Sequence, residues 1–188
     1  RARLVAVVAT LKEQKGHRYL IEAAATVVGR CPDAHFLLIG DGELRHALAG
    51  QVKALGLEEH VHLLGTRHDV PELLAVCDLF ALPSLWEGLA MALVEAMAAG
   101  LPVVATNVSG TGQVVVEGVT GLLVPPADAT QLAESLIALL ENPALAREMG
   151  AAGRQRVESQ FSAAKQATDH LALFGRQFAA SAAAMAVH

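Results

Sequence analysis

Short apolar runs alternate with longer segments of helical periodicity along most of the chain. Several of the short runs are apolar almost throughout, which is typical of strands covered on both faces of a parallel sheet. We predict strands at residues 4–10, 35–40, 60–64, 79–83, 103–106 and 122–124. Between them we predict helices at residues 17–29, 43–55, 70–77 and 89–99, and a short one around 113–117.

After the last predicted strand the pattern is helical to near the end of the chain. Asp128 and Asn142 carry side chains that cap helix N-termini well, and Pro143 suits the first position of a helix. We therefore predict helices at residues 128–140, 143–160 and 163–180.

Strand–helix alternation repeated this often predicts an α/β fold. The expected architecture is a Rossmann-like, doubly wound parallel sheet of about six strands with flanking helices. We assign residues 1–160 to this domain and residues 161–188 to a helical C-terminal tail of the same domain. Ligands of such sheets bind at the carboxyl ends of the strands, so the residues that follow each strand are the candidates for a site.

Composition limits the possible functions. Of the 188 residues, 53% are hydrophobic and 18% are charged, which supports a sizeable core and argues against disorder. A net charge of −5 argues against a general nucleic-acid binder. Cys31 and Cys77 form no CxxC pair, so neither a zinc site nor a disulfide framework is indicated. Without a membrane-length apolar run or a signal peptide, we expect a reduced, cytoplasmic location.

Two common phosphate-binding loops do not occur in the sequence. The stretch "IGDGELRHA" contains Gly40 and Gly42 but lacks the third glycine of a dinucleotide fingerprint, and it follows the second predicted strand. No GxxxxGK[ST] stretch is present. The sequence therefore argues against a nicotinamide-dependent enzyme and against a P-loop NTPase.

The stretch "SLWEGLAMALVEAMAAG" places two acids, Glu87 and Glu95, in an apolar run after the fourth predicted strand. Gly88 allows close backbone approach, and the peptide N–H groups at the following helix start form an anion site. Glu95 lies roughly 12 Å further along the helix. This spacing suits a ligand with hydroxyl groups on either side of a diphosphate. Alternatively, Glu87 complements the helix dipole and Glu95 pairs with a lysine.

Lys15 follows the first predicted strand in the stretch "LKEQKGH". Gly16 comes next and a helix begins, so the ammonium group can meet a diphosphate at the same edge of the sheet. The alternative is a solvated loop lysine.

The chain resembles the C-terminal, donor-binding domain of retaining glycosyltransferases of family 4, which belong to the glycosyl transferases group 1 and have the GT-B fold. The resemblance covers essentially the whole chain. Its most specific part is two glutamates separated by seven residues and followed by "AMAAGLPVVAT". The other stretches that carry it are "LKEQKGHRYLIEAAA", "PDAHFLLIGDGELRHAL", "VHLLG" and "GVTGLLVPPAD".

The resemblance implies a role for each matching residue. Glu87 corresponds to the glutamate that contacts the transferred sugar near its anomeric carbon, and Lys15 to the lysine that binds phosphate and steadies the leaving group. Glu95 corresponds to the residue that hydrogen-bonds the ribose. The remaining donor-binding candidates are Gly88, Leu89, Ala90, Met91 and Ala92 at the diphosphate, and Leu64, Gly65 and Arg67 at the nucleobase.

The sequence departs from the family pattern at two places. Where the family often has Gly-Arg before its lysine, this chain has Ala9 and Thr10. Thr10 can donate a hydrogen bond but carries no charge, so diphosphate binding relies more on Lys15. The family's Gly-x-Gly after the first glutamate ends in Ala90, which disfavours positive φ.

The resemblance also implies a scope for this chain. It predicts transfer of sugar from a UDP- or GDP-sugar to an acceptor hydroxyl, in polysaccharide or glycolipid biosynthesis, with no cofactor and no metal in the site. The acceptor-binding N-terminal domain is missing, so we expect weak donor binding, little activity and self-association through an orphaned surface. Any peripheral membrane association is expected to come from the missing half.

Three alternatives stay open. The same fold can serve as a non-catalytic nucleotide-binding module, although the presence of Glu87 and Lys15 disfavours this. The chain can also be a domain of a glycogen- or starch-synthase-like GT-B enzyme. A nucleotide-sugar epimerase is disfavoured more strongly by the extended match from Glu87 to Thr106.

Overall fold

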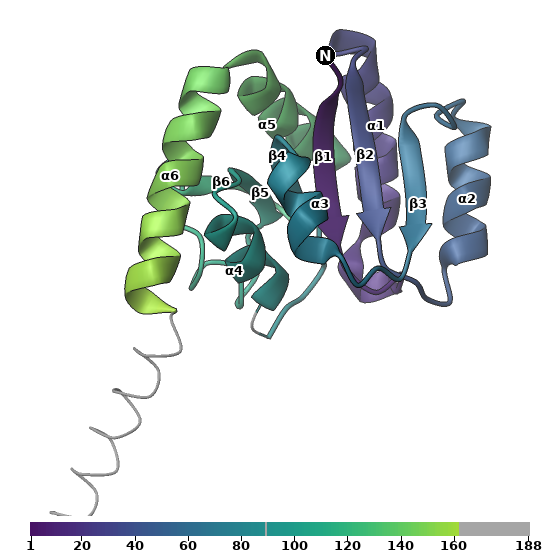
Figure 1. The fold of residues 1–188 in the computed structure, drawn as a ribbon. Helices are drawn as coiled ribbons and strands as arrows, with labels where there is room; N and C mark the ends of the chain where they lie inside the picture. Colours follow the sequence, from purple (N-terminus) through teal and green to yellow (C-terminus); the bar gives the residue numbers. More distant parts are fainter. Residues whose placement is uncertain (89, 162–188) are drawn as a thin grey trace, which may run out of the picture. The chain divides into compact units, whose positions relative to one another are not determined.

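The computed structural model describes residues 1–88 and 90–161 (Figure 1). The chain divides into two compact units, Arg1–Arg154 and Gln155–His188, which we treat separately. The predicted helix at residues 163–180 lies outside the described residues, as does Leu89. The assignment of residues 161–188 to a tail of the same domain stays a prediction.

The first unit contains a six-stranded parallel sheet, as the strand–helix alternation predicts. The spatial order of its strands is β3-β2-β1-β4-β5-β6. This order reverses between β1 and β4, which are neighbours in the sheet although two strands separate them in sequence. The fold is therefore the predicted Rossmann-like, doubly wound sheet. The strands are β1 (Arg3–Val8), β2 (Ala34–Ile39), β3 (Val61–Gly65), β4 (Leu79–Leu82), β5 (Val103–Thr106) and β6 (Gly121–Val124).

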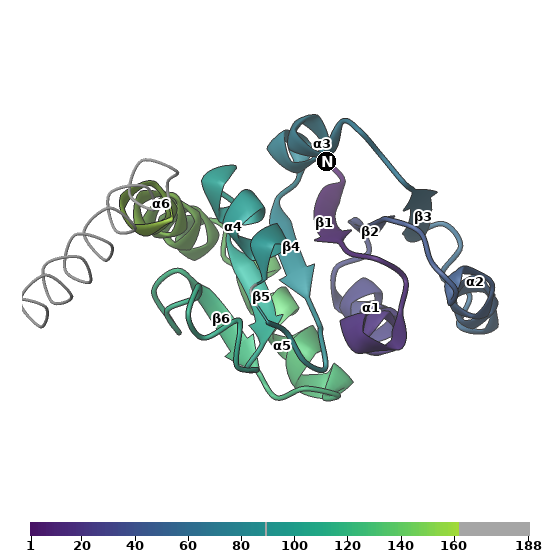
Figure 2. The same cartoon turned by 90° about the horizontal axis from the view of Figure 1, so that it is seen from below.

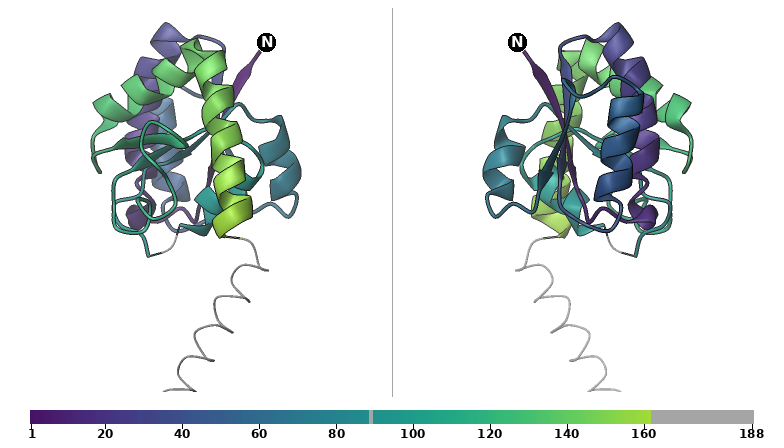
Figure 3. Two further views of the ribbon diagram at one scale, coloured as in Figure 1. Left: turned by 90° about the vertical axis from the view of Figure 1, so that its left-hand side faces the viewer. Right: turned by 90° about the vertical axis from the view of Figure 1, so that its right-hand side faces the viewer.

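Helices cover both faces of this sheet (Figure 2). Helices α1 (His17–Arg30), α2 (Arg45–Ala54) and α5 (Ala129–Glu141) lie on one face, and α3 (Val70–Val76) and α4 (Met91–Ala98) lie on the other. The edge-on views in Figure 3 show the same layers. Helix α6 (Pro143–Gln160) begins in the first unit, and a short 3-10 helix, η1 (Glu13–Lys15), precedes α1.

The main core lies between the sheet and the first of these helix layers. Alternate residues of the central strands point into it, among them Val5, Val7, Phe36 and Leu38. Helices α1 and α5 contribute Leu20, Ile21, Val27, Leu132, Leu136 and Leu140 to the same cluster. Burial of these branched side chains provides the main driving force for folding.

The predicted elements agree with the structure to within two residues at their ends, with one exception. Residues 113–117 do not form a helix: they form a turn that leads to a single bridge between Glu117 and Gly121. Three consecutive valines at 114–116, set between Gly112 and Gly118, explain this, because β-branched residues and glycine both disfavour helix.

Both predicted helix caps are confirmed. The Asp128 Oδ1 atom accepts a hydrogen bond from the Gln131 N–H at 2.9 Å. The Asn142 Oδ1 atom accepts one from the Leu145 N–H at 3.2 Å. These contacts satisfy N–H groups that the first turn of a helix leaves without a partner.

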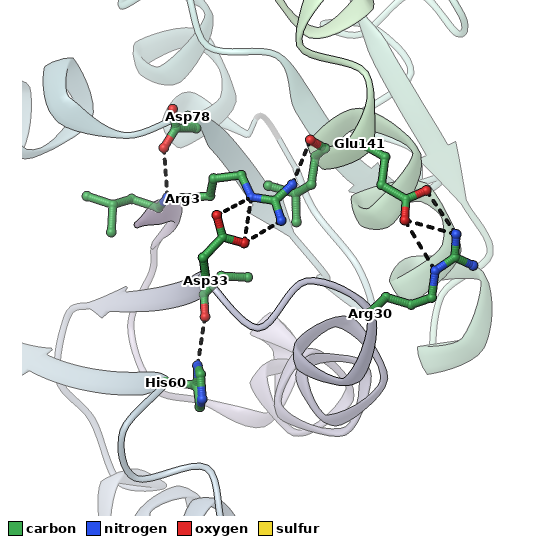
Figure 4. Close-up of polar contacts among 9 residues, drawn as sticks. Arg3, Arg30, Asp33, His60, Asp78 and Glu141 are labelled. Atoms are coloured by element: carbon green, nitrogen blue, oxygen red, sulfur yellow. Dashed lines mark hydrogen bonds and ion pairs between the residues drawn. The ribbon is translucent and has the colours of Figure 1, made fainter. Parts of the chain in front are cut away.

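Ion pairs close the amino edge of the sheet (Figure 4). The Arg3 guanidinium binds the Asp33 carboxylate through Nε at 2.9 Å and donates to the Leu140 carbonyl at 2.8 Å. Its hydrogen bonds lower the pKa of Asp33 and are matched by a raised pKa of Arg3. Nearby, Arg30 at the end of α1 binds Glu141 at the end of α5 at 2.9 Å. The charged side chains named here therefore already have protein partners.

Gly16 provides a test of the close contact between the loop after β1 and the end of β4. Its φ is +63°, and a Cβ atom there would lie 2.0 Å from the Pro83 carbonyl oxygen. We expect Gly16→Ala to lower the free energy of unfolding by about 3 kcal/mol, because the left-handed backbone and the collision add. Denaturant titration measures this.

Gly56 is the matched control for that substitution. It has a similar φ of +66°, but within residues 1–88 and 90–161 nothing lies within 4 Å of a Cβ placed there. Gly56→Ala should therefore cost only the left-handed backbone term, about 1 kcal/mol. Equal losses in the two variants would contradict a tight contact between the loop after β1 and the end of β4.

Candidate functional site

The loops that follow β1 and β4 are fastened together at the carboxyl edge of the sheet. The Leu85 N–H donates to the Gln14 carbonyl at 2.7 Å, and the Gln14 side chain donates to the Trp86 carbonyl at 3.0 Å. Gly16 brings the chain close enough to Pro83 for these contacts to form. As a result, Lys15 and Glu87 lie next to each other although 72 positions separate them in sequence.

Lys15 and Glu87 form an ion pair. The Lys15 Nζ atom lies 2.5 Å from Glu87 Oε1, and the two side chains are 23% and 5% exposed. The buried Ser84 hydroxyl also donates to Glu87 Oε1, at 2.7 Å. Charged groups are tolerated at such low exposure when they are paired and hydrogen-bonded. The structure thus brings together the two residues predicted as catalytic.

Hydroxyl groups from the end of β5 and the loop after it hold the backbone around Glu87 in place. Thr106, at the end of β5, donates to the Ser84 carbonyl at 2.5 Å, and Thr111 donates to the Thr106 carbonyl at 2.5 Å. Ser109 donates to the Glu87 carbonyl at 3.1 Å. All of these hydroxyl groups follow or end a neighbouring strand, so the position of Glu87 depends on the loop after β5 as well.

Sequence reasoning missed the roles of Ser84, Thr106 and Ser109. The available signal was the polar stretch "TNVSGTG", which follows the fifth strand and therefore lies at the same edge as "PSLWEG". It also missed Gly110, where a Cβ atom would lie 2.0 Å from the Gly88 carbonyl oxygen. The close backbone approach inside the protein occurs at Gly110, whereas no atom of the described residues lies within 4 Å of a Cβ placed on Gly88.

The helix that follows Glu87 begins at Met91, two residues later than expected. Its N-cap residue, Ala90, is buried and has φ −82°, so the alanine that replaces a family glycine causes no strain. Among the described residues, the N–H groups of Met91 and Ala92 have no hydrogen-bond acceptor. Of the predicted diphosphate cradle, Ala90, Met91 and Ala92 are described and Leu89 is not.

Glu95 lies exposed on α4 and lines a groove of about 600 Å³ between α3 and α4. Most of the other residues that line this groove are apolar, including Val70, Pro71 and Leu74. In the described part of the chain no lysine or arginine forms an ion pair with Glu95. The alternative in which Glu95 pairs with a lysine is therefore wrong for those residues. The lysine partner belongs to Glu87 instead.

The predicted nucleobase residues lie after β3, at the same edge. Gly65 has φ +70° and accepts a hydrogen bond from the Gly40 N–H at 2.8 Å, which turns the chain after the strand. Leu64 is exposed. Arg67 forms a two-pronged ion pair with Asp69, which raises the pKa of Arg67 and lowers that of Asp69. The Arg67 guanidinium is thus held within its own loop.

Thr10, the remaining predicted donor contact, is exposed directly after β1. Residues 1–88 and 90–161 contain no group of three or more histidine, cysteine, aspartate or glutamate side chains that could hold a metal ion. In the same part of the chain no helix is long and apolar enough to cross a membrane. The predicted independence from metal stays a prediction.

Known proteins are similar to this chain in sequence and in fold. Residues 1–156 match the family of glycosyl transferases group 1. The N-acetyl-alpha-D-glucosaminyl L-malate synthase of Bacillus anthracis is 37% identical over 158 residues, which cover 84% of this chain and 41% of that protein. A GDP-mannose-dependent mannosyltransferase of Corynebacterium glutamicum, which acts on a monoacylated phosphatidylinositol monomannoside, is 36% identical over 173 residues, covering 85% and 43%.

A solved structure also resembles this chain over most of its length. HepE of Anabaena, crystallised in complex with UDP and glucose, superposes with a TM-score of 0.83 at 30% identity and covers 91% of this chain and 48% of its own. This chain therefore spans less than half the length of the relatives compared, with 41%, 43% and 48% covered.

A buried histidine beside the site leads to a prediction on pH. His17, the first residue of α1, is 2% exposed, and its Nδ1 atom has no hydrogen-bond partner among the described residues. Burial, and secondarily the charge of Lys15, lowers the pKa of His17 from 6.5 to about 4. Below pH 6.5 the unfolded chain therefore binds the proton more readily than the native state. This contribution to stability is complete above pH 6.5 and is lost as the pH falls toward 4.

We expect the native protein to lose about 2 kcal/mol of unfolding free energy through His17 between neutral pH and pH 5. Denaturant titrations at several pH values measure the loss, and His17→Gln should remove that part of it. His46→Gln, at an exposed position of α2, is the control and should keep the pH dependence of the native chain. An unchanged pH profile in His17→Gln would contradict the assignment.

Proposed function

Because the chain belongs to the family of glycosyl transferases group 1, we propose that it binds a nucleoside-diphosphate sugar at the carboxyl edge of its sheet. The observation that carries this proposal is the pairing of Lys15 with Glu87, which comes four positions before Met91, the first residue of α4. A cation, a carboxylate and peptide N–H groups without an acceptor in the described part of the chain all follow strands at the edge where doubly wound sheets bind ligands.

Each part of the donor meets a group of suitable chemistry in this proposal. The diphosphate binds Lys15 and the N–H groups of Met91 and Ala92, which complement its negative charge. Glu87 orients the sugar through its hydroxyl groups. Glu95 accepts hydrogen bonds from the ribose. The nucleobase lies against the loop after β3, and the backbone there, rather than the paired Arg67, binds it.

The proposed reaction is transfer of the sugar with retained configuration, as in glycosyltransferases of family 4. The bond between the anomeric carbon and the phosphate oxygen breaks, and its electron pair stays with the departing diphosphate. The acceptor oxygen forms the new bond on the same face of the sugar, and its proton passes to the diphosphate. Lys15 and the start of α4 stabilise the charge that develops on the leaving group, which is an electrostatic contribution to catalysis.

Names of relatives support the substrate class. HepE of Anabaena binds UDP and glucose, and the Corynebacterium relative depends on GDP-mannose. We propose a UDP- or GDP-sugar as the donor, and a cytoplasmic reaction that leads to a polysaccharide or glycolipid. An acceptor-binding domain contributed by sequence outside this chain completes the enzyme, since the chain covers less than half of its relatives.

Glu95 provides a test of donor binding. We expect Glu95→Ala to weaken binding of the preferred nucleotide among UDP, GDP and ADP about tenfold or more, because a charge-assisted hydrogen bond to the ribose is lost. Calorimetric titration measures the dissociation constants. Glu134→Ala, at an exposed position of α5 on the other face of the sheet, is the control and should bind as the native chain does. Identical affinities in the native chain and Glu95→Ala would argue against the ribose role.

A second test asks whether this chain alone has transferase activity. This chain alone should show little or no release of UDP from UDP-glucose or of GDP from GDP-mannose, because the acceptor-binding domain lies outside it. Chromatography of the released nucleotide measures this, with heat-denatured protein as the blank. Robust transfer to an added acceptor by the 188-residue chain would show that the second domain is not required.

A further inference from the structure

The candidate site holds its cation and its buried carboxylate against each other. Lys15 Nζ lies 2.5 Å from Glu87 Oε1, and the carboxylate side chain is only 5% exposed. The group proposed to bind the diphosphate thus already has an anionic partner supplied by the protein. Building on the proposed function, we infer that Glu87 and the donor diphosphate compete for Lys15, so that donor binding releases Glu87 from the ion pair.

Competition follows from the charges. A diphosphate that reaches the Lys15 ammonium also approaches the Glu87 carboxylate, because the two side chains are in direct contact. Both are anions, and their repulsion is poorly screened by water at such low exposure. The arrangement with Lys15 bound to both anions is therefore disfavoured. The ammonium turns toward the diphosphate, and the carboxylate gives up its contact with Lys15.

The structure provides for Glu87 after this exchange. The Ser84 hydroxyl donates to the same carboxylate oxygen at 2.7 Å, and Ser84 is itself held through its carbonyl by Thr106. Neither contact involves Lys15. Glu87 therefore keeps a neutral hydrogen-bond donor when the lysine leaves, and the capacity that is freed accepts hydrogen bonds from sugar hydroxyl groups.

This exchange couples two parts of the donor. Without a diphosphate, Glu87 stays bound to Lys15 and is not available to a sugar. With a diphosphate, the carboxylate is released at the position next to the sugar. The site thus recognises a sugar only when a diphosphate is attached to it, which prevents abundant free sugars from occupying it.

Substitution of Glu87 distinguishes a carboxylate that competes with the diphosphate for Lys15 from one that only positions Lys15. If Glu87 only helps to position Lys15, Glu87→Gln weakens UDP binding. If the carboxylate competes, the same variant removes both the rival anion and the repulsion, and UDP binds more tightly. We expect its dissociation constant for UDP to fall roughly three- to tenfold relative to the native chain. In the native chain we expect UDP-glucose to bind more tightly than UDP, because the released Glu87 contacts the sugar. In Glu87→Gln we expect the two dissociation constants to be equal.

Calorimetric titration with UDP and then UDP-glucose measures both effects. Glu141→Gln is the control, because it neutralises another ion-paired glutamate, the partner of Arg30, at the opposite edge of the sheet (Figure 4). It should leave both dissociation constants unchanged. If the native chain binds UDP and Glu87→Gln binds it equally or less tightly, this inference fails while the proposed function stands. If neither protein binds any of UDP, GDP and ADP, both fail.

A crystal structure of the native chain with UDP tests the same point without a substitution, in case Glu87→Gln does not fold. The inference requires the Lys15 Nζ to Glu87 Oε1 separation to exceed the 4 Å limit of an ion pair, with Nζ on a phosphate oxygen. An intact pair with UDP bound, at a separation of about 2.5 Å, would overturn it.

Discussion

The parallel pairing of β1 with β4 creates the candidate site. Val5 pairs with Leu79 and Ala6 with Phe80, so the two strands end side by side at the reversal point of the sheet. Loops from distant parts of the chain then meet, and hydrogen bonds from Leu85 and Gln14 join them. The ion pair at their ends depends on strand pairing rather than on any local preference of either loop.

Charged side chains lie at both the amino and the carboxyl edges of the sheet, but their surroundings differ. At the amino edge, Arg3 binds the Asp33 carboxylate and the Leu140 carbonyl, and these contacts join three separate segments of the chain. At the carboxyl edge, Glu87 of the buried pair is followed in the chain by α4, whose first N–H groups have no acceptor in the described part of the chain. A paired cation next to unsatisfied donors is an arrangement that an anionic ligand can complete. This difference, rather than the number of charges, is the reason to place the candidate site at the carboxyl edge.

Much of this could be predicted from the sequence because the fold is encoded by repeated local patterns. Apolar runs with both faces buried mark the strands, and side chains such as Asp128 mark helix starts. Once the strands are known, the rule that ligands bind at their carboxyl ends leads to Lys15 and Glu87. The failure at residues 113–117 has a local cause: the length suits a helix, but the valines there disfavour one. The support of Glu87 by Ser84, Thr106 and Ser109 could not be predicted, since hydroxyl groups show no periodic pattern.

The sequence by itself determined the succession of strands and helices along the chain, the doubly wound class and the candidate residues for binding a diphosphate sugar. Those properties depend on local periodicity and on residue type. The tertiary structure alone decided which charges neutralise each other. It paired Glu87 with Lys15, left Glu95 exposed on its helix and kept Arg67 on Asp69. Electrostatic partners depend on distances of a few ångströms between loops, and these distances arise only when the strands have packed.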